Sequence, residues 1–279
     1  MKPEPTAIHI LSLGAGVQSS TLALMAAAGE IGPMPTAAIF ADTKAEPASV
    51  YKWLDWLETQ LPFPVYRVCE KDGLEADALR VRERKDKTGS WVPSGIPHYS
   101  ISKDGSKGQG PRQCTHDFKI TPVLREARKL MKLAGTKKLI QWIGISTDEA
   151  HRMKPSRVKY ATNVWPLIDR GMNRQSCLTW MENKGFPKPP RSSCVFCPYH
   201  NNAEWRRLRD EEPEDFQKAI DFELAYQQAK ASTVWKGAAS TSFFLHPDRV
   251  PLNHVDLSTE EDRGQLDMFG NECEGMCGV

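Results

Sequence analysis

The chain has 279 residues, enough for one large domain with a smaller attachment. Hydrophobic residues make up 40% and charged residues 26% of it, which is typical of a soluble globular protein. No apolar run approaches the roughly 18 residues that cross a bilayer, so we expect no membrane partner. The first residues lack the basic and apolar regions of a secretory signal, which predicts a cytoplasmic location. The net charge of +2 does not by itself predict nucleic-acid binding.

The first part of the chain alternates short apolar runs with helical patterns. We expect strands over 8–13, 36–41 and 64–69, and helices over 19–28 and 47–61. A parallel crossover needs a helix to return the chain. The alternation therefore predicts a doubly wound α/β fold, with a mainly parallel sheet and helices on both faces.

The segment 85–110 changes character, because Gly, Ser, Lys and Pro replace the apolar periodicity. It predicts a mobile loop, either a lid or plain disorder. A helix over 121–133 and a strand over 139–145 follow, and 213–231 is the longest helical pattern near the end. We expect one domain at 1–168 and a mainly helical, cysteine-containing region with a flexible tail at 169–279.

A glycine and serine turn joins the first expected strand to its helix, from Ser12 to Ser20. Glycine lets the backbone approach a ligand, while helix N-terminal amides and serine hydroxyls donate hydrogen bonds to phosphate oxygens. The turn matches neither the Walker P-loop nor the dinucleotide motif. An anion site and an ordinary structural turn remain equal alternatives on these residues.

The turn resembles the Ser-x-Gly-x-x-Ser-Ser loop of the PP-loop ATP pyrophosphatases, which have an adenine nucleotide alpha hydrolase-like fold. Within that family it resembles the branch of phosphoadenylyl-sulfate (PAPS) reductases and DNA phosphorothioation enzymes. The resemblance implies that the turn binds ATP, and that its contact residues are Ser12, Gly14, Ala15, Gly16, Gln18, Ser19 and Ser20. The acidic residue common in the family loop is missing here.

Asp42 and Thr43, at the end of the second expected strand, resemble the family's Asp-Thr element. The resemblance implies that both contact the nucleotide, and that Asp42 holds Mg²⁺ and is catalytic. A helix cap before Pro47 is the alternative role of Asp42.

Two later segments extend the resemblance. Arg112, Cys114, Thr115 and Lys119 match an Arg-x-Cys-Thr-x-x-x-Lys element, which implies that Arg112 and Lys119 face the phosphates. Such cations stabilise the negative charge that accumulates on departing pyrophosphate. Gly144 begins a segment that resembles Gly-x-Arg-x-x-Glu, with Ser146 at the usual basic position, and is a further cofactor contact. The resemblance of these ordered motifs implies that 1–168 is a PP-loop nucleotide-binding domain.

Cysteine spacing predicts a thiol site in the second half. The chain has seven cysteines, and an odd number argues against a fully paired disulfide framework. Cys194 and Cys197 form a Cys-x-x-Cys turn that suits a metal or a redox pair, and Cys177 and Cys114 would complete four thiolates. Spacing does not separate a [4Fe-4S] cluster from Zn²⁺. The resemblance favours the cluster, with unligated thiols as the third alternative.

The short tail contains glycine and carries Cys273 and Cys277. Two cysteines in a mobile terminus can deliver a nucleophilic sulfur and then form a disulfide. The reductases of the resembled family carry a Glu-Cys-Gly nucleophile near their end, which this tail matches in part. A passive, frayed terminus is an equal alternative.

The resemblance implies an ATP-dependent enzyme that adenylates an oxygen, releases pyrophosphate and transfers sulfur. Its acceptor would be a nucleotide, a nucleic acid or a small molecule, with ATP and Mg²⁺ as cofactors and a sulfur donor protein as a partner. The first alternative is a sulfonucleotide reductase that uses the tail cysteines. The second is a zinc-stapled module that binds nucleotides or nucleic acid without catalysis.

Overall fold

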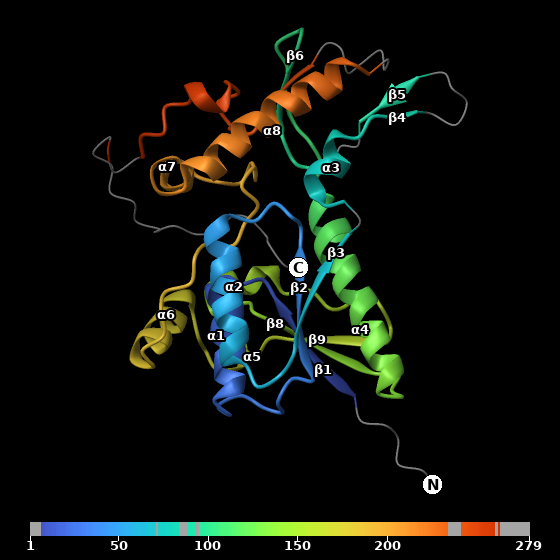
Figure 1. Cartoon of the computed structure of the whole chain (residues 1–279), viewed down its shortest axis with the longest axis vertical. Helices are drawn as coiled ribbons and strands as arrows, with labels where there is room; N and C mark the ends of the chain where they lie inside the picture. Colours follow the sequence, from blue (N-terminus) through green and yellow to red (C-terminus); the bar gives the residue numbers. More distant parts are fainter. Residues whose placement is uncertain are drawn as a thin grey trace.

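The computed structural model describes residues 7–70, 72–83, 89–92, 95–233, 241–259 and Asp262. Its centre is a sheet of five strands that all run parallel, in the order β3-β2-β1-β8-β9 (Figure 1). The strands are β1 (Ile8–Leu13), β2 (Ala37–Asp42), β3 (Val65–Cys69), β8 (Leu139–Ile143) and β9 (Ala161–Val164).

Helices cover both faces of this sheet. On one face lie α1 (Val17–Ala27), α2 (Ala48–Gln60), α5 (Pro166–Asp169) and α6 (Arg174–Asn183), and on the other lies α4 (Thr121–Leu133) (Figure 1). Neighbouring side chains of a strand point to opposite faces. Leu11 and Leu13 of β1 accordingly pack with α1 and α2, whereas Ile8 and Ile10 pack with α4. The expected doubly wound α/β fold is confirmed.

Helix α4 shows why the sequence folds in this way. Its buried residues include Val123, Ala127 and Met131, which are spaced four residues apart and so share one face. Leu124 and Leu130 flank this face and are half-buried against the same core, while most of the charged residues of the helix are exposed. Apolar burial of this kind contributes about 2 kcal/mol for each large side chain and fixes α4 against β1 and β2.

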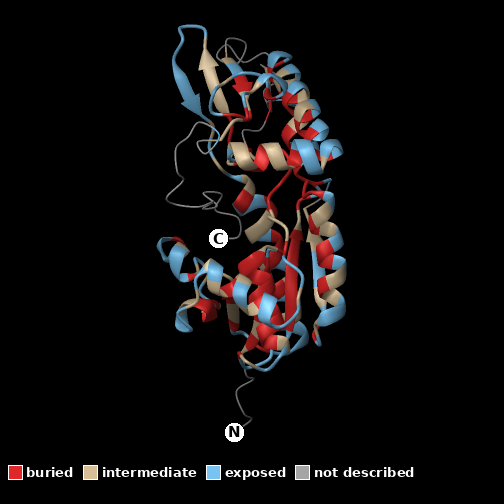
Figure 2. Cartoon of the chain, turned by 90° about the vertical axis from the view of Figure 1, so that its left-hand side faces the viewer, coloured by how far each residue is buried: buried red, intermediate tan, exposed pale blue. Residues whose placement is uncertain are grey.

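A second lobe lies above the sheet in Figure 1 and has its own core. The core is aromatic, with Phe196 stacked on Phe222 at 4.0 Å between ring centroids and Trp205 completely buried. Figure 2 shows buried residues concentrated in both lobes. The elements of the second lobe are α3 (Leu74–Leu79), β4 (Arg82–Glu83), β5 (Ser90–Trp91), β6 (Tyr99–Ser102), β7 (Lys107–Gln109), α7 (Asn202–Glu211), α8 (Pro213–Ala231), β10 (Thr241–Phe244) and the 3₁₀-helix η4 (Leu252–His254).

The structure differs from the loop expected over 85–110. Strands β6 and β7 pair with each other, and β10 adds a third antiparallel strand to β6. Phe243 of β10 pairs with Ser100 and supplies a buried aromatic ring. Because the apolar side chain comes from a distant strand, the segment shows no periodicity of its own. We expected a loop from that absence.

Core packing crosses the boundary expected at residue 168. Cys177 and Met181 of α6 belong to the same hydrophobic cluster as α1, and Leu74 and Phe118 belong to the cluster of the second lobe. The division into segments 1–168 and 169–279 stays a prediction. In the described part of the chain, no helix has the length and apolar character needed to cross a membrane.

Candidate functional site

A pocket opens at the carboxyl ends of β1, β2 and β8. Strand β1 lies in the middle of the sheet, and the chain continues to β2 on one side, whereas β8 and β9 lie on the other side. The connections that follow β1 and β8 therefore diverge at this edge. In open α/β sheets, such a switch point is the usual place for a ligand.

The turn between β1 and α1 forms one wall of the pocket. Gly16 is the N-cap of α1, and no side chain caps the first-turn amides there, so these N–H groups are available to an anion. The Gly14 amide donates to the Ser19 hydroxyl at 3.1 Å, which holds the turn closed. Ala15 has a φ of 57°, in the left-handed region that favours glycine. Backbone strain of this kind clusters at ligand sites.

Gly144 brings the end of β8 against the same turn. A Cβ atom on Gly144 would lie 2.8 Å from both the amide nitrogen and Cα of Ser19. Only a residue without a side chain allows this approach. The absence of a side chain at position 144 thus lets the end of β8 contact the first turn of α1.

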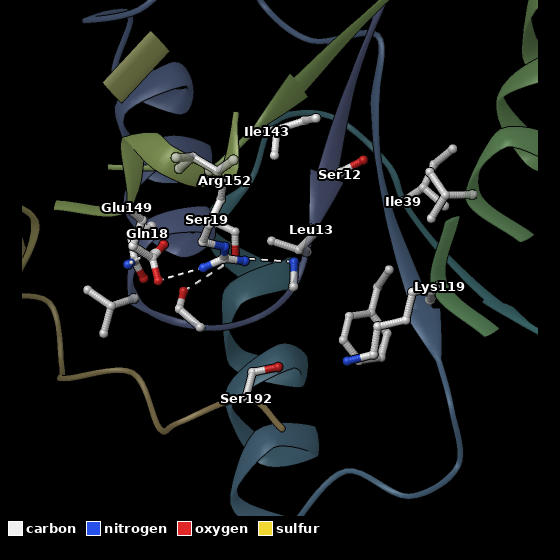
Figure 3. A pocket seen from close by; sticks show the side chains of 18 of the residues that line it. Ser12, Leu13, Gln18, Ser19, Ile39, Lys119, Ile143, Glu149, Arg152 and Ser192 are labelled. Carbon is white, nitrogen blue, oxygen red and sulfur yellow. Dashed lines mark hydrogen bonds and ion pairs between the residues drawn. The ribbon is translucent and has the colours of Figure 1, made fainter. Parts of the chain in front are cut away.

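A polar network sets the position of Gln18 in the pocket. The Gln18 amide nitrogen donates to Ser146 at 3.3 Å and to Glu149 at 3.2 Å, and the Arg174 guanidinium donates to the Gln18 oxygen at 3.1 Å. Glu149 in turn forms an ion pair with Arg152 at 2.5 Å. Glu149 and Arg152 come from the 3₁₀-helix η2 (Thr147–Arg152). Figure 3 shows Gln18, Glu149 and Arg152 together on one side of the pocket.

Lys119 lies on the opposite side of the pocket (Figure 3). It comes from the π-helix η1 (Thr115–Ile120), and its ammonium lies 3.1 Å from a carboxylate oxygen of Glu46. The other carboxylate oxygen accepts a hydrogen bond from Ser192 at 3.4 Å. The Glu46 side chain is only 1% exposed, and the Lys119 side chain is 17% exposed. Glu46 therefore fixes Lys119 at the wall.

The remaining lining is largely apolar. Ile39 and Phe40 come from β2, Ile143 and Ile145 from β8 and the residues after it, and Val123 from α4. An apolar cavity with a few convergent polar groups is typical of a small-molecule site. Chemically, the pocket offers amide donors and a cation for an anionic group, and apolar side chains for a flat ring.

The structure brings together most of the residues that the sequence predicts for nucleotide binding. Those in the pocket lining are Ser12, Gly14, Gly16, Gln18, Ser19, Lys119 and Gly144. Ala15 and Ser20 are completely buried outside this lining, and Ser20 accepts a hydrogen bond from the Trp53 indole at 2.9 Å. Thr43 is also buried outside it, where its hydroxyl lies 3.3 Å from the Cys194 sulfur.

Asp42 lies at the end of β2 but is absent from the pocket lining. One of its carboxylate oxygens accepts hydrogen bonds from the Tyr51 hydroxyl and the Lys44 amide, both at 2.7 Å. Burial and the Asp42 carboxylate raise the pKa of Tyr51, so its phenol remains a donor. A magnesium contact from Asp42 stays a prediction.

Arg112 is likewise not part of the lining. Its guanidinium donates to the Thr115 hydroxyl at 3.0 Å and lies 5.3 Å from the centroid of the Tyr199 ring. The structure thus separates the two cations that the sequence assigned to the phosphates. Only Lys119 reaches the pocket.

The cysteines divide between the two lobes. Cys194 and Cys197 form a tight turn, with the Cys197 amide donating to the Cys194 carbonyl at 2.9 Å, and Cys114 packs against the same core. Cys177 is instead buried in the cluster around α1. Burial raises the pKa of Cys177 to about 12, and burial with the Glu46 charge raises that of Cys194 well above its usual value.

Within the described ranges, no three His, Cys, Asp or Glu side chains lie where they would hold a metal ion together. Cys177 lies in a different hydrophobic cluster from Cys114, Cys194 and Cys197, and the four-cysteine site stays a prediction. The expected [4Fe-4S] cluster or Zn²⁺ gains no support from the described residues. Cys273 and Cys277 lie outside the described residues.

The pocket also contains residues that the sequence did not single out as site residues. They are Gln141, Glu149, Arg152, Arg174, Arg191 and Ser192. Glu149 and Arg152 belong to the segment after Gly144 that resembles the family motif, so the sequence contained a signal for these two residues. Arg174, Arg191 and Ser192 reach the pocket only through tertiary packing, which no local pattern reveals.

Comparison with protein-family models finds no match, and comparison with curated proteins finds none either. Among solved structures, the chain is similar to a crystal structure of phosphoadenylyl-sulfate (PAPS) reductase from Candida auris in a phosphate complex. The two chains are 12% identical, with a TM-score of 0.38, over 66% of this chain and 76% of that chain.

Proposed function

We propose that the pocket binds ATP and that the chain is an ATP-dependent, adenylating sulfur-transfer enzyme. The observation that carries the proposal is the position of the β1–α1 turn at the switch point of a parallel sheet, with uncapped amides on one wall and Lys119 on the other. Phosphates would bind the amides and Lys119, and the adenine ring would occupy the apolar part.

In the proposed reaction, an acceptor oxygen attacks the α-phosphorus of ATP, and pyrophosphate leaves. A sulfide-level sulfur nucleophile, delivered by a donor protein, then displaces AMP from the acceptor. Lys119 would stabilise the charge that develops on the phosphate oxygens, because it is held in place before the reaction by Glu46. The first-turn amides of α1 would do the same from the opposite wall.

Magnesium would enter the pocket with the nucleotide phosphates. Such ions usually take one or two protein carboxylates, with phosphate oxygens and water as the other ligands. Asp42 is the predicted magnesium contact; Glu149 is the acidic side chain of the pocket lining, but its carboxylate already pairs with Arg152 and accepts a hydrogen bond from Gln18. When bound, the ion would neutralise part of the phosphate charge. The [4Fe-4S] cluster, with Zn²⁺ as its alternative, stays a prediction for the cysteines, and no step of the proposed reaction depends on it.

Calorimetry with ATP and Mg²⁺ tests the proposal. Removing Lys119 alone would leave Glu46 as an unpaired buried charge, which costs about 3–5 kcal/mol of stability. The informative variant is therefore Lys119→Met combined with Glu46→Gln. We expect it to remain folded by thermal denaturation and to bind ATP about tenfold or more weakly, since a charge-assisted hydrogen bond is lost.

Lys137→Met is the matched control, because Lys137 is exposed just before β8, at the edge of the sheet opposite the pocket. It should bind ATP as the wild type does. The proposal is wrong if the wild-type protein shows no heat of binding with ATP and Mg²⁺. Release of sulfite from an adenylyl sulfate, without pyrophosphate release from ATP, would identify the reductase instead.

A further inference from the structure

A second cleft adjoins the proposed nucleotide pocket. It runs between α2, the N-terminus of α6, the segment 187–191 and α7. Glu149, Arg152 and Arg174 line both cavities, so a ligand in the cleft would lie directly beside one in the pocket. The cleft encloses about 1270 Å³, more than the roughly 300–1000 Å³ of a typical small-molecule site. Its size suits a segment of a larger molecule.

Charge is distributed unevenly over the walls of the cleft. On the α7 side, Arg207 pairs with Glu204 and Glu212 at 2.8 and 2.6 Å and lies 3.8 Å from Glu211, so this side is acidic. On the opposite side, Lys52 and Lys188 are exposed and form no ion pair within the described part of the chain.

Arg174 adds a third cation at the boundary with the pocket. Its guanidinium donates to the neutral side chain of Gln18 at 3.1 Å. Two carboxylates line the same part of the cleft: Glu149 pairs with Arg152, and Asp148 accepts a hydrogen bond from the Arg174 backbone amide at 3.1 Å. The three cations outnumber Asp148, so this side favours an anion.

The same side of the cleft carries an aromatic platform. Trp56 of α2 is half-buried, with Trp53 behind it at 4.6 Å and Phe186 beside it at 6.0 Å between ring centroids. Trp53 is fixed by its hydrogen bond to Ser20 of α1. The exposed part of the Trp56 indole is thus held rigidly next to Lys52. A rigid ring beside cations suits a planar base with a phosphate.

We propose that this cleft binds the acceptor of the reaction, and that the acceptor is a single-stranded nucleic acid. An unpaired base would stack on Trp56, while backbone phosphates lie near Lys52, Lys188 and Arg174. The volume favours a strand over a free nucleotide. The proposal rests on the proposed function, because adenylation and sulfur transfer require an acceptor next to the nucleotide.

Fluorescence anisotropy with a labelled single strand of about 12 nucleotides tests the proposal, in an RNA and a DNA form of one sequence. The variant Lys52→Glu with Lys188→Glu should bind the strand about tenfold or more weakly, and its affinity should depend less on salt. ATP affinity should stay unchanged, because neither lysine lines the pocket. Lys137→Glu is the control for an exposed charge reversal at the far edge of the sheet and should bind the strand normally.

Trp56 provides a second, independent measurement. Trp56→Ala should weaken strand binding about tenfold, as loss of one stacked base does, whereas Trp56→Phe should keep most of the affinity. Trp180→Ala is the control, because Trp180 lies outside the cleft lining, packs near Phe186 and binds Glu30. The phenylalanine variant keeps the test informative where the alanine variant is unstable.

The acceptor proposal is overturned if neither form of the strand binds, or if the double charge reversal binds it as the wild type does. Free uridine monophosphate could instead bind as tightly as the strand and lose this binding in the double charge reversal. The acceptor would then be a nucleotide, and this proposal would also be overturned. Strand binding in a protein that does not bind ATP would keep the nucleic-acid site and reject the proposed function. ATP binding without strand binding would keep the proposed function and reject the nucleic-acid site.

Discussion

The contact between Gly144 and Ser19 leaves less space than any ordinary side-chain contact, because a Cβ atom would lie 2.8 Å from backbone atoms. Backbone at the end of β8 and at the start of α1 has little freedom to move apart. We expect Gly144→Ala to lower the free energy of unfolding by about 1–3 kcal/mol. We also expect weaker ATP binding, since the first turn of α1 would shift. Urea denaturation and calorimetry measure the two effects.

Gly95→Ala is the control for this substitution, because a Cβ atom there would meet nothing within 4 Å. It should change neither the stability nor the affinity by a comparable amount. If Gly144→Ala binds ATP with wild-type affinity, the close packing of β8 against the turn has no role in holding the nucleotide.

Residue patterns were informative where the site is local in sequence. Gly14, Gly16 and Ser19 lie in one turn, so their spacing predicts a shared wall, and all three line the pocket. Asp42 and Cys177 depend on partners elsewhere in the chain. Tyr51 engages Asp42, and α6 carries Cys177 into the core around α1. The burial of Cys177 against α1 does not follow from the nearby sequence, whereas the Lys44 amide that donates to Asp42 is only two residues away.

Helix α2 begins without a cap from its own segment, because Pro47 occupies the N-cap position. The Ala48 amide instead donates to the Asp215 carboxylate of α8 at 2.8 Å, and Lys218 donates to the other oxygen at 2.7 Å. Burial alone would raise the pKa of Asp215, but these hydrogen bonds outweigh it and lower the pKa below its usual value. The Asp215 carboxylate of α8, in the second lobe, thus caps helix α2, which packs on the sheet, and so connects the two lobes.

We expect Asp215→Asn to lower the free energy of unfolding by about 1–2 kcal/mol at neutral pH. A pKa that is lowered in the folded state contributes stability above the usual value of about 4, and this contribution is lost as the pH falls through the lowered pKa. The difference between wild type and variant should therefore shrink below about pH 4. Denaturant titrations across this range measure it.

Asp221→Asn is the matched control, because Asp221 lies on the same helix and is exposed. It should leave the stability nearly unchanged at every pH. A difference between wild type and Asp215→Asn that stays constant down to pH 3 would contradict an ionic cap on α2.

Elements were predictable where they carry their own periodicity. The strand over 8–13 and the helices over 121–133 and 213–231 have the bounds that the apolar pattern predicts. Strand β6 has no such pattern, and the buried aromatic ring of this small sheet, that of Phe243, comes from β10. Strand β7 follows β6 closely in the chain, but the third strand β10 lies more than a hundred residues away, and the sequence around β6 alone predicts a loop.

The two lobes meet at the turn that follows β2. The Val195 amide donates to the Ala45 carbonyl at 2.7 Å, and the Leu74 amide donates to the Thr43 carbonyl at 3.0 Å. Glu46, which follows in the same turn, forms an ion pair with Lys119 in the pocket. The parallel sheet and the cysteine-containing segment are consequently linked through residues beside the site. Only the sheet was apparent from sequence, because the second lobe is assembled from segments that are distant along the chain.

A ligand in the pocket should therefore stabilise both lobes together. ATP at about 100 times its dissociation constant adds roughly 2.7 kcal/mol to the free energy of unfolding. We expect hydrogen exchange with ATP and Mg²⁺ to slow in peptides over 12–20 and also over 190–196, because Ser19 and Ser192 line the same pocket. The hairpin over 99–109 lies outside the lining and should exchange as before. Protection confined to 12–20 would show that the nucleotide contacts the sheet alone, and that the turn after β2 does not couple the lobes.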